Sequence, residues 1–595
     1  MRILGLSSLG HDTSAALLED GVVRAVIEES KLSRQKDARG LPADAIRFCL
    51  RQAGAGWESV DRVALAATPV RGWIRRSAAG ARISPLDPVA TGHAQVREVG
   101  RLARELGYLR LLRHQAGARL DKKITNVEHH LSHAASAFFL SRYERALVVT
   151  MDEEGDGTSG MIAIGEGTRL RKLRDIPYPH SLAWLYSRIT EILGFVPHAE
   201  EHKTQWLSLG GEPQYRKVFR DMLRQSGAGG LRLDHSYLDH GVGDHFVLSS
   251  KFWQKTGLPR NAADLTPELS EEQRRALAAT VQQVCAEKVG EIIEALRRRH
   301  DVHDVCLAGG LFNNSLLVAS LEQNLGLDHV FVPPAPGNSG TALGAALYLQ
   351  HHEQQVPRKQ YRSNPYWGPG YSRHEIKDVL DSCKARFSFQ VMRERQSDQA
   401  VQLLLGGKII GWFQGAAEFG PRALGNRSVL ASPWGPYVKE NLNDFIKHRE
   451  WFRPFAVSVP IEDAPRYFEY SGLCETMNSL ARVHPGAEGL PEGFVLPGDL
   501  VRLHTVSKEA NPVLWDLLKR FGLQAPAPML INTSFNLFGE PLVVSPLDAI
   551  RSYACSGIDA LLMDNFLLTK APFAAAPVPA REANSAPTSL SRISA

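Results

Sequence analysis

The sequence has little of what marks secreted, membrane-spanning or metal-ribbon proteins. It contains six cysteines in 595 residues, none in a CxxC pair, which argues against a zinc ribbon or a disulfide framework and for a reducing compartment. No apolar run approaches the ~20 residues of a membrane span. The opening segment MRILGLSSLGHDTS lacks an apolar core of signal-peptide length. We therefore expect a cytoplasmic protein.

Two common nucleotide-binding loops are excluded as well. The sequence has no GxxxxGK[ST] loop. The literal GxGxxG at 155–160 is followed by an apolar, strand-like run and another glycine turn, whereas a dinucleotide fingerprint requires a helix there. A bound nucleotide would have to be held by another architecture.

The length and composition indicate a globular protein with more than one domain. With 44% hydrophobic and 22% charged residues, 595 residues are too many for a single core. A polar stretch with prolines and glycines predicts a linker at 356–370. We expect one domain at 1–355, a second at 371–571 and a disordered tail at 572–595.

A strand pattern occurs twice in the first domain. The runs at 3–8, 14–19 and 22–29 read as strand, loop, strand, tight turn and strand, and the runs at 147–152, 159–165 and 168–173 repeat this order. Both copies carry glycine and acidic residues in the first loop. The repeat predicts a duplicated α/β domain, the organisation of the actin-like phosphotransferase (ASKHA) architecture, with the ligand in a cleft between the halves.

Two glycine segments fit such a cleft. Gly309 and Gly310 follow a short strand-like run, and Gly337 and Gly340 precede a helical one. Backbone amides at helix starts can approach phosphate or ribose, although each segment alone is also an ordinary turn from loop to helix. Together, in a duplicated fold, they favour a nucleotide.

The stretch VEHHLSHAASAF contains three histidines within an expected helix. His129 and His133 lie four residues apart and so project from one helical face. Such a pair can bind a metal, but it can also be two satisfied histidines of the core. The residues alone leave both interpretations open.

Positive charge is concentrated in one segment. Residues 71–123 carry twelve Lys or Arg against four Asp or Glu and show helical periodicity. A nucleic-acid-binding arm is one interpretation. A solvated helical insert beside an anionic site is the other, which we favour because basic patches are common and nonspecific.

The second domain has cations in glycine- and proline-rich segments. Arginines bind phosphate oxygens bidentately and hydroxyls add neutral donors, so this group is typical of a polyanion site without a P-loop, although a solvated surface loop is the alternative. The cations are Arg422, Arg427, Lys447, Arg449 and Arg453, and the segment at 531–546 adds Asn532, Thr533, Ser534 and Asn536.

These motifs together resemble the O-carbamoyltransferases of antibiotic and nodulation-factor biosynthesis, typified by tobramycin carbamoyltransferase. The resemblance covers about residues 1 to 570 and is carried by GHDTSAALLEDG, HHLSHAASAF, the AGG…N segment, GTALGAAL, GPRALGNRS and NTSFN…GEP. It implies an actin-like first domain and a second domain like YrdC.

The resemblance also implies two half-reactions. In the second domain, carbamoyl phosphate and Mg-ATP would give carbamoyl-adenylate. In the first, the carbamoyl group would pass to a hydroxyl of a small-molecule natural product with release of AMP. The residues matching the carbamoyl phosphate and ATP site are Arg422, Arg427, Lys447, Arg449, Arg453, Asn532, Ser534 and Asn536; Gly309, Gly310, Asn313 and Gly337 would hold the adenylate.

The family match further assigns catalytic and metal roles. His11 would activate the acceptor hydroxyl, and Asp12 would orient His11 or the substrate. A His-Asp pair in a loop is also common in local turns, in which the Asp side chain bonds to the backbone. Lys203 aligns with a lysine of the acceptor region. The metal ligands would be His129, His133, Asp152 and Asn338, with Fe(II) expected and Zn or Mn as alternatives.

The sequence departs from the family pattern at two positions. Asn338 stands where the family usually has Asp, which weakens the expected metal site, and Trp206 stands where glycine is usual. We infer from Trp206 an altered acceptor pocket that could stack on a ring. A tRNA threonylcarbamoyl-type transferase and a non-catalytic nucleotide-binding scaffold are the alternative functions; no membrane or nucleic-acid partner is expected.

Overall fold

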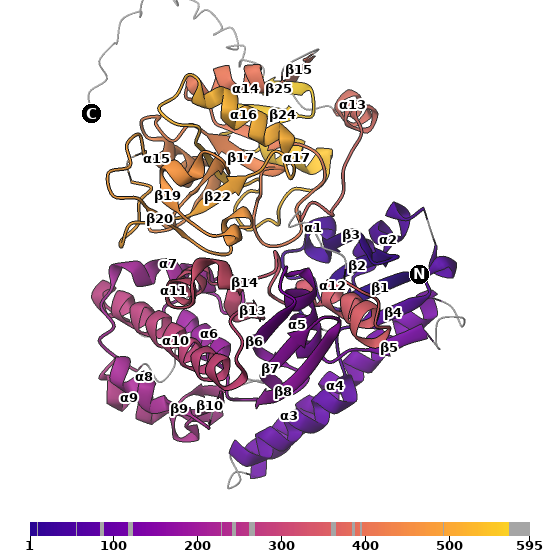
Figure 1. Cartoon of the computed structure of the whole chain (residues 1–595), viewed down its shortest axis with the longest axis vertical. Coiled ribbons are helices and arrows are strands. Elements are labelled where there is room, and N and C mark those ends of the chain that lie inside the picture. Colours follow the sequence, from indigo (N-terminus) through magenta and orange to yellow (C-terminus); the bar gives the residue numbers. More distant parts are fainter. Residues whose placement is uncertain are drawn as a thin grey trace, which may run out of the picture.

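The computed structural model is mixed α/β, as predicted, and contains three large sheets (Figure 1). It describes residues 1–8, 10–54, 56–83, 88–116, 123–227, 229–240, 246–260, 268–358, 365–383, 387–392, 396–491 and 493–570. Part of the predicted linker and the predicted tail lie outside this range. We call the described residues up to 358 the N-terminal part and those from 365 onward the C-terminal part.

The N-terminal part contains two five-stranded sheets with one strand order. In each, three consecutive strands form an antiparallel meander and two later strands add in parallel beside the first, which is the duplication that the two sequence meanders predict. The first sheet has the order β3-β2-β1-β4-β5, with β1 (Arg2–Ser7), β2 (Ser14–Glu19), β3 (Val22–Glu28), β4 (Arg62–Leu65) and β5 (Ile124–Asn126). The second has the order β8-β7-β6-β13-β14, with β6 (Arg145–Gly155), β7 (Thr158–Glu166), β8 (Arg169–Pro177), β13 (Val305–Ala308) and β14 (Val330–Phe331).

Two helices join the halves by crossing between them. Helix α5 (His129–Leu140) follows the first sheet but packs on β6 and β13 of the second, whereas α12 (Gly340–Leu347) follows the second sheet but packs on β1 and β2 of the first. Glycine allows this close approach: a Cβ at Gly5 would lie 2.0 Å from the Ala342 oxygen, and one at Gly344 would lie 1.8 Å from the Ser132 oxygen. The halves are therefore tightly joined beside the strand ends.

Further helices surround the two sheets, and four short strands form two small hairpins. The basic segment forms two long helices, α3 (Pro69–Ile83) and α4 (Pro88–Ala116), as its periodicity predicts. The others are α1 (Glu29–Ser33), α2 (Ala43–Gln52), α6 (Leu182–Ile192), α7 (Glu201–Leu207), α8 (Arg216–Met222), α9 (Ser250–Thr256), α10 (Glu271–His300) and α11 (Ser315–Leu325); the hairpins pair β9 (Leu223–Gln225) with β10 (Leu231–Leu233) and β11 (Leu238–His240) with β12 (Phe246–Leu248).

The C-terminal part is built on an eight-stranded mixed sheet. Its order is β15-β25-β24-β16-β17-β23-β18-β22. The strands are β15 (Phe387–Val391), β16 (Ile410–Phe413), β17 (Arg427–Ala431), β18 (Ala456–Pro460), β22 (Leu503–Val506), β23 (Leu530–Ser534), β24 (Ala560–Met563) and β25 (Phe566–Lys570). A small sheet contains β19 (Phe468–Glu469), β20 (Ala481–Val483) and β21 (Leu500–Val501), and the helices are α13 (Arg373–Ser382), α14 (Gln396–Leu405), α15 (Val438–Leu442), α16 (Pro512–Gly522) and α17 (Pro546–Ala554).

Buried polar contacts fix the C-terminal part against the first sheet. Lys31 Nζ donates to the carbonyls of Glu418 and Gly420, at 2.8 Å each, and pairs with Glu28 at 3.0 Å. The Gly420 amide donates in turn to Glu28. None of the described helices is both long and apolar enough to cross a membrane.

Candidate active site

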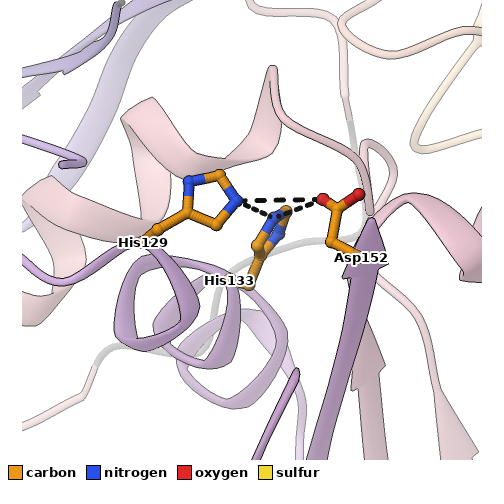
Figure 2. A group of neighbouring side chains, drawn as sticks. All are labelled: His129, His133 and Asp152. Carbon is orange, nitrogen blue, oxygen red and sulfur yellow. Dashed lines mark hydrogen bonds and ion pairs between the residues drawn. The ribbon is translucent and has the colours of Figure 1, made fainter. Parts of the chain in front are cut away.

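Two histidines of one helix and an aspartate of a neighbouring strand converge in the N-terminal part. His129 and His133 lie on one face of α5, and Asp152 lies in β6. The two Nε2 atoms are 3.1 Å apart, and Asp152 Oδ2 lies 3.1 Å from His133 Nε2 and 3.8 Å from His129 Nε2 (Figure 2). A Cβ at Gly155 would lie 2.0 Å from the His129 ring, so glycine leaves the room that this ring needs. The structure thus brings three of the four predicted metal ligands together.

The donor set fits a divalent cation. Burial opposes ionisation of Asp152, but the hydrogen bonds and charges of the two histidines hold its pKa well below its usual range. Burial also lowers the pKa of His133, which favours the neutral imidazole that ligates metals. Burial opposes protonation of His129 too, but Asp152 raises its pKa, so metal binding would displace a proton there. Two imidazoles and a carboxylate suit Fe(II), Zn(II) or Mn(II). His130 is instead a satisfied core histidine, with its ring nitrogens 2.9 Å from the Thr150 hydroxyl and 3.2 Å from the Thr158 carbonyl.

His11, the predicted base, lies beside acidic residues and is accessible. Its Nδ1 is 2.9 Å from Asp12 Oδ2, and its ring centroid is 6.1 Å from that of His198, which pairs with Glu153. Burial opposes protonation of His11, but the hydrogen bond to Asp12 and the charges of Asp12, Asp152 and Glu153 raise its pKa to about 9. The side chain is 40% exposed, so solvent screens part of this effect and an acceptor can reach the ring.

Asn338 contacts His11 and has an unsatisfied oxygen. Its Nδ2 lies 3.2 Å from His11 Nε2, while its buried Oδ1 has no hydrogen-bond partner in the part of the chain that the structure describes. Oδ1 is therefore the atom that Asn338 can offer to a cation. A neutral amide oxygen binds a cation more weakly than the carboxylate usual in the resembling family.

The glycine segments lie against the same cluster. A Cβ at Gly310 would lie 2.9 Å from Asp152 Oδ1, and one at Gly337 would lie 3.0 Å from Asn313 Nδ2. Gly309 has a φ of +102°, and a Cβ there would lie 2.1 Å from the Met151 oxygen. Both the backbone angle and the lack of space exclude any residue other than glycine at position 309. The four residues predicted to hold an adenylate are thus next to Asp152 or to one another.

Four arginines of the C-terminal part form a cationic cluster: Arg422, Arg449, Arg453 and Arg502. Burial, followed by the charge of Arg453, lowers the pKa of Arg422 to about 10 and that of Arg449 to about 9. Burial and the other three guanidiniums lower the pKa of Arg502 well below its usual range. The Nε atoms of Arg422 and Arg502 are buried, and none of the described residues gives them a hydrogen-bond partner. Unsatisfied cationic donors at this density are typical of an anion site.

Lys447, Ser534 and Asn536 form a hydrogen-bonded group beside these arginines. Lys447 Nζ donates to the carbonyl oxygens of Ser534 and Asn536, at 2.8 and 3.0 Å, and to the Asn536 side chain at 2.6 Å. Burial, then the charges of Arg449 and Arg453, lower the pKa of Lys447 well below its usual range. Asn532 lies deeper: it is buried, its Nδ2 donates to the Ser458 hydroxyl, and its Oδ1 has no partner.

Helix α7 meets this cluster from the N-terminal part. Lys203 Nζ lies 2.7 Å from Glu200 and 2.5 Å from Glu450 of the C-terminal part, so it bridges the two parts. His202 precedes it, and its buried Nε2 has no hydrogen-bond partner. Burial, then Arg453 and Arg422, lower the pKa of His202 well below its usual range and keep it neutral. Arg422 also donates to the Asn313 carbonyl at 2.8 Å, which links the two sites directly.

The expectation that Trp206 stacks on an acceptor ring is wrong. Trp206 is 4% exposed and packs against Ala319, Leu480 and Leu500, with the Arg502 guanidinium 5.8 Å from its ring. The indole therefore fills the interface between the parts. Local sequence could not predict that the helix of Trp206 packs against the C-terminal part.

Arg427 differs from the other predicted phosphate-binding residues. Its five N–H groups donate to five backbone carbonyls, and its guanidinium lies 3.7 Å from the Phe413 ring centroid. No donor is left for a phosphate. The structure therefore makes Arg427 a structural residue, and we remove it from the anion site.

Replacing Arg427 by methionine should destabilise the fold rather than remove a substrate contact. The buried carbonyls would lose their donors, so we expect the thermal midpoint to fall by roughly 5 °C or more. Arg298→Met, at a side chain that is 79% exposed on α10, is the matched control and should leave the midpoint unchanged. Normal stability of R427M together with lost phosphate binding would return Arg427 to the anion site.

The cations of the basic segment partly face inward. Arg75, Arg76 and Arg101 pair with Glu128 and Glu154, acids beside the metal-ligand residues. These inward ion pairs agree with the predicted helical insert beside an anionic site. It removes these three cations from any nucleic-acid surface, the feature that favoured a tRNA-modifying function.

Sequence reasoning did not identify Arg502, His202, His198 or Glu153. Arg502 stands alone between buried residues in LVRLHTV, and a lone arginine in such a run is a signal that could have been used. His202 lies next to the predicted Lys203, and Glu153 next to Asp152. His198 gave no signal in the sequence.

Comparisons with known proteins find similarity to one family along nearly the whole chain. The family models described as carbamoyltransferase N-terminus and carbamoyltransferase C-terminus match residues 2–347 and 401–570. Nodulation protein NolNO of Sinorhizobium fredii is 32% identical over 94% of this chain and 79% of its own length. The 3'-hydroxymethylcephem-O-carbamoyltransferase of Amycolatopsis lactamdurans is 32% identical over 39% of this chain and 42% of its own length. A crystal structure of full-length HypF, 14% identical over 58% of this chain and 46% of its own, aligns with a TM-score of 0.31, too low to establish a shared fold.

Proposed function

The chain belongs to the carbamoyltransferase family, and on that premise we propose that it is an ATP-dependent O-carbamoyltransferase. Water would hydrolyse carbamoyl phosphate to carbamate and phosphate, and a carbamate oxygen would attack the α-phosphorus of ATP to give carbamoyl-adenylate and displace pyrophosphate. A small-molecule hydroxyl would then take the carbamoyl group and release AMP. In architectural terms we propose an actin-like duplicated N-terminal unit and a YrdC-like C-terminal domain.

The cationic cluster is the observation that carries the proposal. Carbamoyl phosphate and ATP are polyanions, and Arg422, Arg449, Arg453 and Arg502 present more charge than the neighbouring Glu450 balances. The unpaired Nε donors of Arg422 and Arg502 can bind phosphate oxygens. Lys447, Ser534 and Asn536 lie next to the cluster with Asn532 behind them, and they would exchange part of their mutual hydrogen bonds for contacts with the substrates.

The hydrogen bond from Arg422 to Asn313 joins the proposed adenylation site to the proposed transfer site. The carbamoyl-adenylate would therefore move only a short distance between them. Asn313 adjoins Gly337, and Gly310 faces Asp152, so the adenylating cluster and the proposed transfer site share a boundary. Enclosure there would limit hydrolysis of the reactive carbamoyl-adenylate. Lys203 would close this boundary by pairing with Glu450.

In the transfer site His11 would accept the proton of the acceptor hydroxyl in its neutral form, so transfer should rise as the pH increases toward the raised pKa of His11, about 9. Asp12 holds the ring through Nδ1, and the acceptor hydroxyl would replace the Asn338 amide that contacts Nε2 at 3.2 Å. Gly309, Gly310 and Gly337 admit the adenylate close to the backbone. A divalent cation at His129, His133 and Asp152, Fe(II) or alternatively Zn(II) or Mn(II), would supply charge that stabilises the AMP leaving group.

Carbamoylation itself is tested with a panel of hydroxyl acceptors. The protein, ATP, Mg²⁺, carbamoyl phosphate and a divalent transition metal are incubated with aminoglycosides, glycosylated macrocycles and lipo-oligosaccharides. Mass spectrometry should find an acceptor that gains one carbamoyl group, together with AMP. Formation of ADP in place of AMP would contradict an adenylate intermediate.

Restoring a carboxylate at position 338 should strengthen the metal site. Asn338→Asp adds a negative charge where Oδ1 now has no partner, so we expect the dissociation constant for Mn(II) to fall about tenfold. Isothermal titration calorimetry measures this directly. Asn324→Asp on the exposed face of α11 adds the same charge elsewhere and should have no effect. Equal Mn(II) affinity in N338D and the wild type would place residue 338 outside the metal site.

A further inference from the structure

The α3–α4 hairpin packs directly on the turn after β6, the strand that carries the proposed metal ligand Asp152. These helices connect β4 and β5 of the first sheet, and Leu112 of α4 packs in the core of that sheet, but Arg76 and Arg101 pair with Glu154 of β6 in the second sheet. A Cβ at Gly157 would lie 2.3 Å from Arg75 Cβ, and one at Gly72 would lie 3.1 Å from Asp156 Cα. Helix α3 therefore touches the turn backbone, without intervening side chains at these points.

The same turn holds a dense group of carboxylates. Residues 152–156 read Asp-Glu-Glu-Gly-Asp, so four acids occupy five positions next to the ligand Asp152. Mutual repulsion would spread such a loop unless cations offset it, and buried, unpaired carboxylates are costly. The loop needs positive partners from elsewhere in the chain.

Two arginines of the hairpin supply that charge to Glu154. Arg101 donates to Glu154 Oε2 at 2.9 Å, and Arg76 lies 3.3 Å from Glu154 Oε1. Arg76 is 6% exposed and also pairs with Glu98 at 2.7 Å, while Arg101 pairs with Glu105 at 3.0 Å. Glu154, two residues beyond Asp152, also accepts the Gly157 amide at 2.6 Å, which fixes the β6–β7 turn.

The hairpin also holds the start of the histidine helix. Arg75 donates to Glu128, the residue before His129, at 2.9 Å. Asp156 accepts the backbone amides of Thr68 and His129, both at 2.8 Å, and so ties the base of α3 to the first residue of α5. Both chain segments that supply metal-ligand donors are therefore attached to one insert.

We propose that Arg76 and Arg101 are positioning residues of the metal site, which act through Glu154 to hold Asp152 opposite His129 and His133. This inference rests on the proposed metal site. It gives the basic segment a function that does not involve a nucleic acid: its inward cations organise ligands contributed by the other half of the N-terminal part.

The test measures Co(II) binding to the full-length protein. Calorimetry gives the affinity, and the visible ligand-field spectrum reports the coordination of the bound ion. Arg101→Gln should weaken Co(II) binding about 10- to 100-fold and change the spectrum, as loss of residues that orient ligands does. Arg101→Lys should recover part of the affinity because it restores a cation beside Glu154. Arg298→Gln on the exposed surface of α10 is the control.

A double-mutant cycle separates positioning from a general loss of structure. If Arg101 acts through Glu154, R101Q and E154Q will have strongly non-additive effects on Co(II) affinity. R101Q should also keep carbamoyl-phosphate-dependent pyrophosphate release, which reports on the C-terminal part. Wild-type Co(II) affinity and spectrum in R101Q, or additive effects in the cycle, would overturn the inference alone. Absence of Co(II) binding by the wild type would overturn the metal site and the inference with it.

Discussion

Arg502→Ala is expected to reduce carbamoyl-phosphate-dependent pyrophosphate release about 10²- to 10³-fold, the usual cost of removing one preorganised donor from a site of developing charge. Among the described residues the buried Nε of Arg502 has no hydrogen-bond partner, and burial and the charges of Arg422, Arg449 and Arg453 lower the pKa of its guanidinium. Arg502→Lys keeps the charge but loses the planar fork, so it should recover a small part of the rate. Steady-state pyrophosphate release at varied carbamoyl phosphate measures both variants.

The matched control for Arg502 is Arg466→Ala. Arg466 is an exposed arginine of the same part of the chain, next to Tyr467, and its loss should leave the rate unchanged. A folded R502A that releases pyrophosphate at the wild-type rate would show that the cationic cluster does not bind the substrates of adenylation.

His11→Asn is expected to separate the two half-reactions. Transfer to the acceptor should fall about 10²- to 10⁴-fold, the range for loss of a general base, while pyrophosphate release persists. The reason is the set of neighbours: His11 contacts Asp12 and Asn338 of the N-terminal part and none of the four clustered arginines among the contacts of the described residues. Carbamoylated acceptor and pyrophosphate are measured in one reaction.

His329→Asn provides a close control for His11. His329 also pairs with an aspartate through Nδ1, at 2.8 Å from Asp304, and is 49% exposed. It should have no effect on either product. Equal loss of both products in H11N would mean that His11 supports the structure or the adenylation step, and normal transfer would remove it as the base.

Local sequence predicted the parts of the structure that local interactions determine. The two meanders appear at their expected positions because alternating apolar runs and tight turns specify hairpins. The spacing of His129 and His133 placed both on one helical face. Asp152 was predicted only through the family resemblance, and the structure places it in the strand that packs against this helix.

Long-range packing decided what local sequence could not. Arg427 and Arg422 lie five residues apart in one glycine-rich loop, but the fold surrounds Arg427 with carbonyls and leaves Arg422 facing other cations. Trp206 is buried because the C-terminal part covers it. The contact between the hairpin and the metal-ligand loop joins residues 76 and 154, and no spacing rule relates such distant positions.

Pyrophosphate release from ATP, measured with and without carbamoyl phosphate and without any acceptor, tests the central claim most directly. The account predicts release that depends on carbamoyl phosphate, with AMP formed as the carbamoyl-adenylate hydrolyses slowly. No release from a protein that still binds ATP, or release that is indifferent to carbamoyl phosphate, would contradict adenylate formation by this chain.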